Sequence, residues 1–360
     1  MKYHPITDTI DLQASLRDIL DTQEFKSVYP TLSEYLDSFE QQGIPAKNDL
    51  KQLLNFLVTG LSNAKGTQSR FRNEAERFTL FCWHERGKSV LDIKLEDIKL
   101  YIDWIWSPPK NLISDTTISS RFKYRSNSDI RVVNPEWRPF VHRAPKANRK
   151  IESFIAPGKA SSIKHAYKLS QTSLRNSYAS LNVFFKWLID AELVMRNYLA
   201  DAKKNCKYLT KGKIYQPPHT FDDEVWDTFI QSLTDAANEN PKFEIHRFVV
   251  LSLKVLFLRI SELSSRDYYT PLFNHFRPDP SNEGWVLHVV GKGKKERVVT
   301  VPDSYIENVL GRYRESMGLS PLPRIDEDTP ILPSMKTGKA LKQDSVNNIV
   351  EETFDLVIST

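Results

Sequence analysis

The spacing of apolar residues predicts helices along most of this chain. In residues 1–64, leucines and isoleucines recur every three or four positions, which places them on one face of a helix. The two apolar stripes consist of Leu12, Leu16, Ile19 and Leu20, and of Leu50, Leu53, Leu54 and Leu57. The tripeptide Gly43-Ile44-Pro45 breaks the helical pattern between them. We therefore predict an N-terminal helical extension over residues 1–64, which is either a separate arm or accessory domain, or an appendage that only packs.

A second group of helices is predicted between residues 65 and 205. Aromatic residues with helical spacing occur in residues 71–82, and Gly87 is suited to end that helix. Residues 95–106 (LEDIKLYIDWIW) predict a second helix, which two prolines end. Residues 172–194 predict a third helix with one aromatic and leucine face. Because large apolar groups at helical spacing are normally buried, we expect these faces to form the core of one domain.

The last part of the chain, residues 219–360, predicts a mixture of helix and strand. Apolar residues from Ile245 to Phe257 predict a buried helix that carries Arg259 at its end. Residues 285–290 and 297–301 are rich in β-branched residues, and the loop between them contains two glycines. This pattern predicts an antiparallel β-hairpin. The fold class expected for the whole chain is therefore mainly α, with an α+β domain at the end that holds a small antiparallel sheet.

Positive charge is concentrated between residues 110 and 170. This stretch has 13 Lys and Arg against 4 Asp and Glu, a net charge of +9, whereas the whole chain has +5. We expect it to be irregular in conformation and to contact phosphates, because a local excess of cations is typical of nucleic-acid interfaces. A solvated loop is the alternative. The candidate contacts are Arg121, Lys123, Arg125, Arg138 and Arg143.

A second basic segment precedes the last domain. Residues 206–218 are expected to form a linker, because lysines and a pair of prolines gather there and just before it. Its lysines are candidates for contacts with a nucleic-acid backbone, and an ordinary solvated linker is the alternative. These lysines are Lys203, Lys204, Lys207, Lys211 and Lys213.

Composition excludes several classes of protein. The chain has no apolar run long enough to span a membrane and no apolar signal core at its N-terminus. Cys82 and Cys206 are the only cysteines, which indicates a reducing compartment without a disulfide framework or a zinc site. The pI near 8.9 is compatible with a nucleic-acid partner. We therefore expect a cytoplasmic protein that has no membrane partner.

Two motifs resemble those of the tyrosine recombinases, the phage integrase family. LRISEL contains Arg259 and Glu262, and GKGKKERVVTVP places Lys292 33 residues after that arginine. The resemblance implies that Arg259 is a catalytic arginine, that Glu262 supports it, and that Lys292 is a general acid. Such roles fit the residue types, since a guanidinium can hold two phosphate oxygens and an ammonium can supply a proton. An ordinary helical pair and a solvated turn are the alternative. Secondary phosphate candidates are Lys294, Lys295 and Arg297.

The resemblance also implies an architecture and a partner. Residues 65–205 resemble the SAM-like core-binding domain of integrases, and residues 219–360 resemble part of the catalytic domain. A recombinase of this kind would bind double-stranded DNA as a two-domain clamp, self-associate on it, act on no small-molecule substrate, and need no metal or cofactor. One departure concerns the pair Leu256-Phe257, because the family often has Thr-Gly before the arginine.

Two family features are missing after Arg259. No H-x-x-R motif follows it, and the later tyrosines, Tyr305 and Tyr313, come too early in the chain to match the family's nucleophile. We therefore expect a recombinase that is cut off inside its catalytic domain and is inactive alone. The alternatives are a non-catalytic DNA-binding remnant or decoy and, with less support, a helical interaction scaffold.

Overall fold

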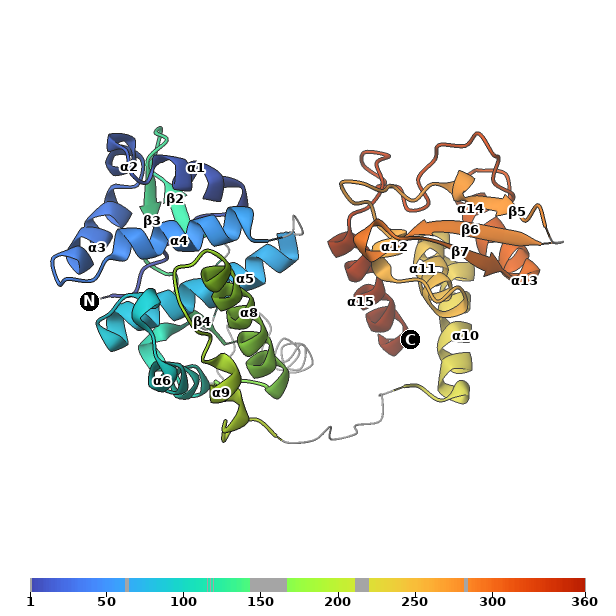
Figure 1. The fold of residues 1–360 in the computed structure, drawn as a ribbon. Helices are drawn as coiled ribbons and strands as arrows, with labels where there is room; N and C mark the ends of the chain where they lie inside the picture. The colour runs from blue at the N-terminus through green and yellow to red at the C-terminus, as the bar shows by residue number, and fades with distance from the viewer. Residues whose placement is uncertain are drawn as a thin grey trace. The chain divides into compact units, whose positions relative to one another are not determined.

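The chain folds into two compact units, residues 1–215 and 216–360 (Figure 1). The computed structural model describes residues 2–61, 65–114, 116, 118, 120–142, 167–210, 220–281 and 284–359. Helices dominate both units, and the strands form small two- and three-stranded sheets. The predicted fold class, mainly α with a small antiparallel sheet, is confirmed. Each unit is described by itself below.

The N-terminal part of unit 1 is helical, as the apolar stripes predicted. Its elements are η1 (Ile10–Leu12), α1 (Gln13–Ile19), α2 (Gln23–Val28), α3 (Pro30–Glu40) and α4 (Ala46–Thr59). Gly43 has a φ of +79° and Pro45 caps α4, so the predicted break between the stripes is present. Leu16, Leu50 and Leu54 have no exposed surface.

The second part of unit 1 contains the other predicted helices. Its helical elements are α5 (Lys65–Phe81), η2 (Cys82–Arg86), η3 (Val90–Asp92), α6 (Leu95–Trp106), η4 (Lys110–Leu112), α8 (Gln171–Asp190) and α9 (Leu199–Lys204). Gly87 adopts the left-handed conformation, with a φ of +60°, and ends the π-helical turn η2. The predicted helix at residues 95–106 has the same bounds as α6.

One hydrophobic core joins both parts of unit 1. Buried residues of α1, α3 and α4 belong to the same cluster as those of α5, α6 and α8. The ring of Phe56 on α4 lies 4.9 Å from that of Phe184 on α8, centroid to centroid. The domain boundary predicted near residue 64 therefore does not separate two cores, and residues 2–61 are an integral layer of this unit.

Short strands occur where the sequence predicted an irregular stretch. β1 (Ile113–Ser114) pairs in parallel with β4 (Phe140–Val141), and β2 (Phe122–Tyr124) pairs antiparallel with β3 (Arg131–Val133). β3 packs on α3, and the hairpin lies beside the first helices of the chain in Figure 1. Strands of two or three residues carry too little alternation to be recognised in a sequence. Residues 143–166 of the basic stretch lie outside the described residues.

Unit 2 places a small sheet among helices. Its helical elements are α10 (Asp223–Glu239), η5 (Pro241–Phe243), α11 (Glu244–Val255), α12 (Ile260–Leu263), η6 (Phe273–His275), η7 (Lys292–Lys294), α13 (Asp303–Tyr305), η8 (Ile306–Gly311), α14 (Arg312–Ser316) and α15 (Gln343–Ser359). The strands β5 (Phe276–Pro278), β6 (Trp285–Val290) and β7 (Glu296–Val301) form an antiparallel sheet in that order. The predicted hairpin is confirmed as β6–β7, in which Val290 pairs with Glu296.

The core of unit 2 holds the hairpin against the helices. Phe248 on α11, Leu287 on β6 and Val346 on α15 are fully buried and belong to one cluster. Alternate residues of β6 enter this core, as expected for a strand with one covered face. Among the described residues of the chain, no helix is long and apolar enough to cross a membrane.

Candidate functional site

Arg259 begins a short helix of its own. The sequence predicted that the buried helix would run to this arginine, but α11 ends at Val255, and Arg259 is the N-cap of α12 with φ −83° and ψ 148°. Phe257 is the reason for the difference. It has a φ of +48° and an exposed ring, so the chain leaves the helical path there. The exposed Phe257 corrects the prediction that it belongs to the buried face.

Glu262 holds Arg259 in two ways. Its Oε2 accepts a hydrogen bond of 2.8 Å from the Arg259 backbone N–H, and its Oε1 accepts one of 3.0 Å from the Arg259 guanidinium. The first bond satisfies an amide that the start of α12 leaves open. The Glu262 carboxylate is fully buried, whereas the Arg259 side chain is 67% exposed. Glu262 therefore contacts the guanidinium of Arg259 and leaves most of that side chain accessible.

Arg297 on β7 is a second cation on the same carboxylate. Its Nη2 donates to Glu262 Oε2 at 2.8 Å and its Nε donates to Oε1 at 3.2 Å. Nη2 also donates to the backbone carbonyl of Phe257 at 3.2 Å. Arg297 was predicted to contact phosphate, and its guanidinium also binds Glu262, while its side chain stays about one-third exposed. One carboxylate thus balances two guanidiniums, which leaves a net charge of +1 on this group of side chains.

These contacts set the charge state of Glu262. Burial raises the pKa of its carboxyl, but the hydrogen bond from Arg297, the bond from the Arg259 amide and the positive charge of Arg297 outweigh burial and lower it below the ordinary value. The same hydrogen bond raises the pKa of Arg297. Glu262 is therefore ionised near neutral pH.

The turn of the β6–β7 hairpin lies against this group. A Cβ placed on Gly291 would lie 3.2 Å from Glu262 Oε1 and 3.9 Å from Arg259 Nη1. Gly291 N–H donates to Lys295 O at 2.7 Å and closes the turn. We call Arg259, Glu262, Gly291 and Arg297 the Glu262 cluster. Because Lys292 follows Gly291 directly, its backbone is brought to this cluster, but its side chain is outside the described part of the structure.

Two further lysines of the turn are exposed. Lys294 has a φ of +59° and Gly293 one of +76°, which bend the loop sharply between the strands. Lys294 and Lys295 both face solvent. Together with Arg259, they give the turn a positive surface that suits an anionic partner.

Arg266 was missed by the sequence analysis. Its guanidinium donates to Val290 O and, at 3.4 Å, to Gly291 O, so it supports the base of the hairpin turn. It also donates to the Tyr268 hydroxyl at 2.8 Å, and Lys294 Nζ lies 5.6 Å from the centre of the Tyr268 ring. The sequence gives no sign of these contacts, since Arg266 meets two carbonyls more than twenty residues away.

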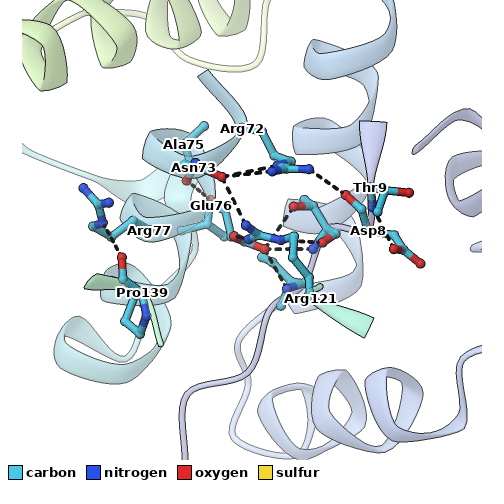
Figure 2. Close-up of polar contacts among 12 residues, drawn as sticks. Asp8, Thr9, Arg72, Asn73, Ala75, Glu76, Arg77, Arg121 and Pro139 are labelled. Carbon is cyan, nitrogen blue, oxygen red and sulfur yellow. Dashed lines mark hydrogen bonds and ion pairs between the residues drawn. The ribbon is translucent and has the colours of Figure 1, made fainter. Parts of the chain in front are cut away.

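Arg121 is buried, which corrects its prediction as a DNA contact (Figure 2). Its guanidinium forms an ion pair with Glu76 on α5 and is only 8% exposed. Arg121 Nε donates to Thr7 O at 2.9 Å, and Nη1 donates to Asn73 Oδ1 at 3.1 Å. A guanidinium surrounded in this way cannot reach a DNA backbone without breaking the interior of unit 1.

The other basic candidates of the β2–β3 region differ in exposure. Lys123 and Arg125 are exposed. Arg138 is half-buried, and its Nη1 donates to Pro135 O at 2.8 Å and to Trp137 O at 2.7 Å. Arg143 lies outside the described residues.

The linker lysines are described only in part. Lys203 and Lys204 end α9 and are exposed. Lys207 forms an ion pair of 3.1 Å with Asp103, although its side chain stays 67% exposed. Lys211 and Lys213 are outside the described residues. Three lysines at this end of unit 1 therefore remain candidates for phosphate contacts.

The Glu262 cluster is suited to bind an anion. The exposed Arg259 guanidinium presents several N–H donors that can hold two oxygens of a phosphate at once. Glu262 fixes one side of that guanidinium, so less conformational freedom is lost on binding. In the part of the chain that the structure describes, no group of three or more His, Cys, Asp and Glu side chains could hold a metal ion.

Comparison with known proteins gives matches among solved structures alone. No family model and no curated protein matches the chain. The XerH site-specific recombinase bound to its difH substrate before cleavage is similar over 99% of this chain and 82% of that chain, with 13% identity and a TM-score of 0.44. A post-cleavage XerH complex with palindromic difH covers 98% and 82%, with 14% identity and a TM-score of 0.46. XerA recombinase covers 86% and 76%, with 13% identity and a TM-score of 0.28. At such low identity and TM-scores the likeness does not assign a family.

Proposed function

We propose that this chain binds double-stranded DNA and carries part of the catalytic site of a site-specific recombinase of the tyrosine class. The observation that carries the proposal is the position of the hairpin turn. Gly291 lies against both Glu262 and Arg259, so two motifs that are separate in the sequence meet at one place. A helical pair and a solvated turn with unrelated roles would have no reason to meet there.

In this proposal, Arg259 binds the non-bridging oxygens of a DNA phosphate. Its side chain is 67% exposed, and one edge is fixed by the buried carboxylate of Glu262. A positioned guanidinium stabilises the extra negative charge that develops when a phosphodiester is attacked. Glu262 is then a positioning residue, because it acts on Arg259 and does not face the phosphate.

Lys292 is proposed as the proton donor to the leaving 5′-oxygen. It follows Gly291 in the turn, and the turn has two residues with positive φ, Gly293 and Lys294. Lys294 and Lys295 would add phosphate contacts on the same turn. General acid catalysis of this kind lowers the barrier for departure of an alkoxide.

We further propose that these 360 residues bind DNA without cleaving it. Tyr305 and Tyr313, the tyrosines after the hairpin, are buried. Tyr305 Oη is 2.6 Å from Ser252 Oγ, and Tyr313 Oη donates to Ile331 O at 3.1 Å. Burial raises the pKa of both hydroxyls, which opposes their use as nucleophiles.

Binding is tested by fluorescence anisotropy with a labelled duplex of random sequence. The wild type should bind at low salt, and doubling the salt should weaken binding several-fold, because phosphate contacts release counterions. Arg259→Ala should reduce the slope of log K against log salt by about 1. Arg324→Ala is the matched control, since that arginine is exposed and pairs with Asp326. Absence of duplex binding by the wild type would overturn the proposal.

Cleavage is tested separately with a nicked suicide substrate. Without a target sequence, the substrate is drawn from a pool of random duplexes, and covalent adducts are detected on denaturing gels. We expect no adduct from residues 1–360. An adduct that requires Arg259 would overturn the proposal of binding without cleavage, while it would support the recombinase assignment.

A further inference from the structure

Phe257 combines two features that do not favour folding. Its backbone has a φ of +48°, and its side chain is 82% exposed. Left-handed backbone is disfavoured for residues with a Cβ and is normally taken by glycine, or by Asn and Asp. An aromatic ring gains most of its stabilising effect from burial. A glycine would make the same bend without strain and without an exposed ring.

The bend itself is fixed by its neighbours. Leu256 and Leu258, on either side of Phe257, are buried in the core of unit 2. Arg297 Nη2 donates to the Phe257 carbonyl at 3.2 Å, so the strained peptide is tied to β7. Because both neighbours are fixed in the core, the backbone keeps the Phe257 ring pointing toward solvent. Strain that persists in such a frame is typical of binding and catalytic sites.

The surroundings of the ring are cationic. Arg259 lies two residues along the chain with an exposed guanidinium, and Arg297 binds the Phe257 carbonyl. The one carboxylate of the cluster, Glu262, is buried beneath these cations. A partner that covers the ring and binds Arg259 must therefore offer an apolar, planar surface to Phe257 and negative charge to an arginine two residues along the chain. A nucleic acid offers both, as phosphate beside base and deoxyribose.

We propose that the Phe257 ring packs against a partly unstacked base of bound duplex DNA, next to the phosphate that Arg259 holds. This inference rests on the proposed function. It adds a contact whose strength depends on how easily the DNA deforms. Apolar side chains inserted at a base step bend the duplex, and flexible pyrimidine–purine steps resist this least. Phe257 thereby selects sites in which such a step lies beside the contacted phosphate.

The test compares Phe257→Gly, Phe257→Leu and Phe257→Trp with the wild-type chain. The probes are two labelled duplexes that differ in one central position, where one is fully paired and the other has a mismatch that loosens stacking. The wild type should bind the mismatched duplex more tightly. Phe257→Gly should lose about tenfold in affinity for it, a typical effect of removing one base–aromatic contact, and Phe257→Trp should retain it. Phe257→Leu should fall between them.

Two further readouts separate this contact from a structural effect. Phe257→Gly should raise the melting temperature of the full chain, because the strained backbone is relieved. It should leave the slope of log K against log salt unchanged, because the ring carries no charge. A 2-aminopurine beside the mismatch should brighten on binding of the wild type and not of Phe257→Gly.

The outcomes are distinguishable. If the wild type binds neither duplex, the proposed function fails and the inference fails with it. If the wild type binds and Phe257→Gly keeps the wild-type affinity for both duplexes, only the inference is overturned. If DNA affinity is unchanged and light scattering shows self-association that Phe257→Gly abolishes, the ring covers a second copy of the chain, and the inference is likewise overturned.

Discussion

Arg297 and Glu262 are joined by two hydrogen bonds, of 2.8 and 3.2 Å, which tie strand β7 to the short helix α12. The carboxylate is fully buried, while the guanidinium is about one-third exposed. Arg259 shares the same carboxylate, so the position of one arginine depends on the other. The hairpin and the start of α12 are therefore expected to move as one structural element.

Replacing Glu262 by glutamine should loosen this element. The shape is kept, but the negative charge that accepts three hydrogen bonds from guanidiniums is lost, and the new amide N–H group faces donors. We expect a loss of about 1–2 kcal/mol in the free energy of unfolding, less than for a fully buried pair because both arginines reach solvent. Urea unfolding of the full chain measures it. Glu296→Gln, at an exposed position next to Arg297, is the control and should be neutral. An equal loss in both variants would contradict this account.

The contribution of Glu262 should depend on pH. Its pKa is lowered in the folded state from an ordinary value of 4.5, so the carboxylate stabilises the fold above that value. As the pH falls through the lowered pKa, the folded state takes up the proton and the stabilisation is lost. The difference in unfolding free energy between wild type and Glu262→Gln should thus be full at neutral pH and shrink below about pH 4. A difference that stays constant down to pH 3 would show that the charge of Glu262 does not stabilise the fold.

Local sequence patterns were sufficient to predict most helices and part of the Glu262 cluster. Residues 95–106 form α6 with the predicted bounds because the apolar period, the two prolines and the acidic first turn all act within the segment. Arg259 and Glu262 are three residues apart, so their contact also follows from local geometry. The β6–β7 hairpin was predicted for the same reason, since both arms and the turn are contiguous.

The parts that the sequence did not predict depend on distant partners. Arg121 was taken for a surface cation, but Glu76 on α5 and the backbone of Thr7 enclose it. Arg297 was predicted as a phosphate contact, and the sequence did not show that it also binds Glu262, 35 residues away. A charged residue in a basic stretch gives no local sign of a buried counter-charge elsewhere. The exposure of Phe257 was not predicted, because the helical pattern was extended to this residue, whose positive φ takes the chain out of the helix.

The ion pair between Asp8 and Arg131 should be a main support of unit 1. Arg131 Nε and Nη2 donate to the two carboxylate oxygens at 2.8 and 2.5 Å, and both side chains are almost fully buried. Asp8→Asn leaves a buried guanidinium without a counter-charge, which costs about 3–5 kcal/mol. Urea unfolding should show this loss.

A double-mutant cycle checks that the loss comes from the pair. In Asp8→Asn with Arg131→Met, no unpaired charge remains, so the double variant should be more stable than the sum of the single losses predicts. Arg131→Lys should not restore full stability, because an ammonium cannot bind both oxygens in the plane of the carboxylate. Strict additivity of the single variants would contradict a direct interaction.

The basic residues of the β2–β3 hairpin should separate into two kinds. Arg121→Ala removes a buried cation that pairs with Glu76, so it should lower the free energy of unfolding by about 3 kcal/mol or more. Lys123→Ala and Arg125→Ala alter exposed side chains and should change stability by less than about 0.5 kcal/mol. If Lys123 and Arg125 contact DNA, each of these variants should also reduce the slope of log K against log salt for duplex binding by about 1.

Measuring both quantities on all three variants tests whether burial decides the role of each cation. The guanidinium of Arg121 already donates to Glu76, Thr7 and Asn73. Its loss should therefore lower the free energy of unfolding, and it should change DNA affinity only by disturbing the β2–β3 hairpin. Unfolding should therefore be studied in urea at low salt, and the salt slope below the onset of unfolding. A stable Arg121→Ala variant with a reduced salt slope would place Arg121 on the DNA surface after all. If Arg121 is an interior guanidinium, the Arg121→Ala variant should be unstable, and its folded fraction should show an unchanged salt slope of DNA binding.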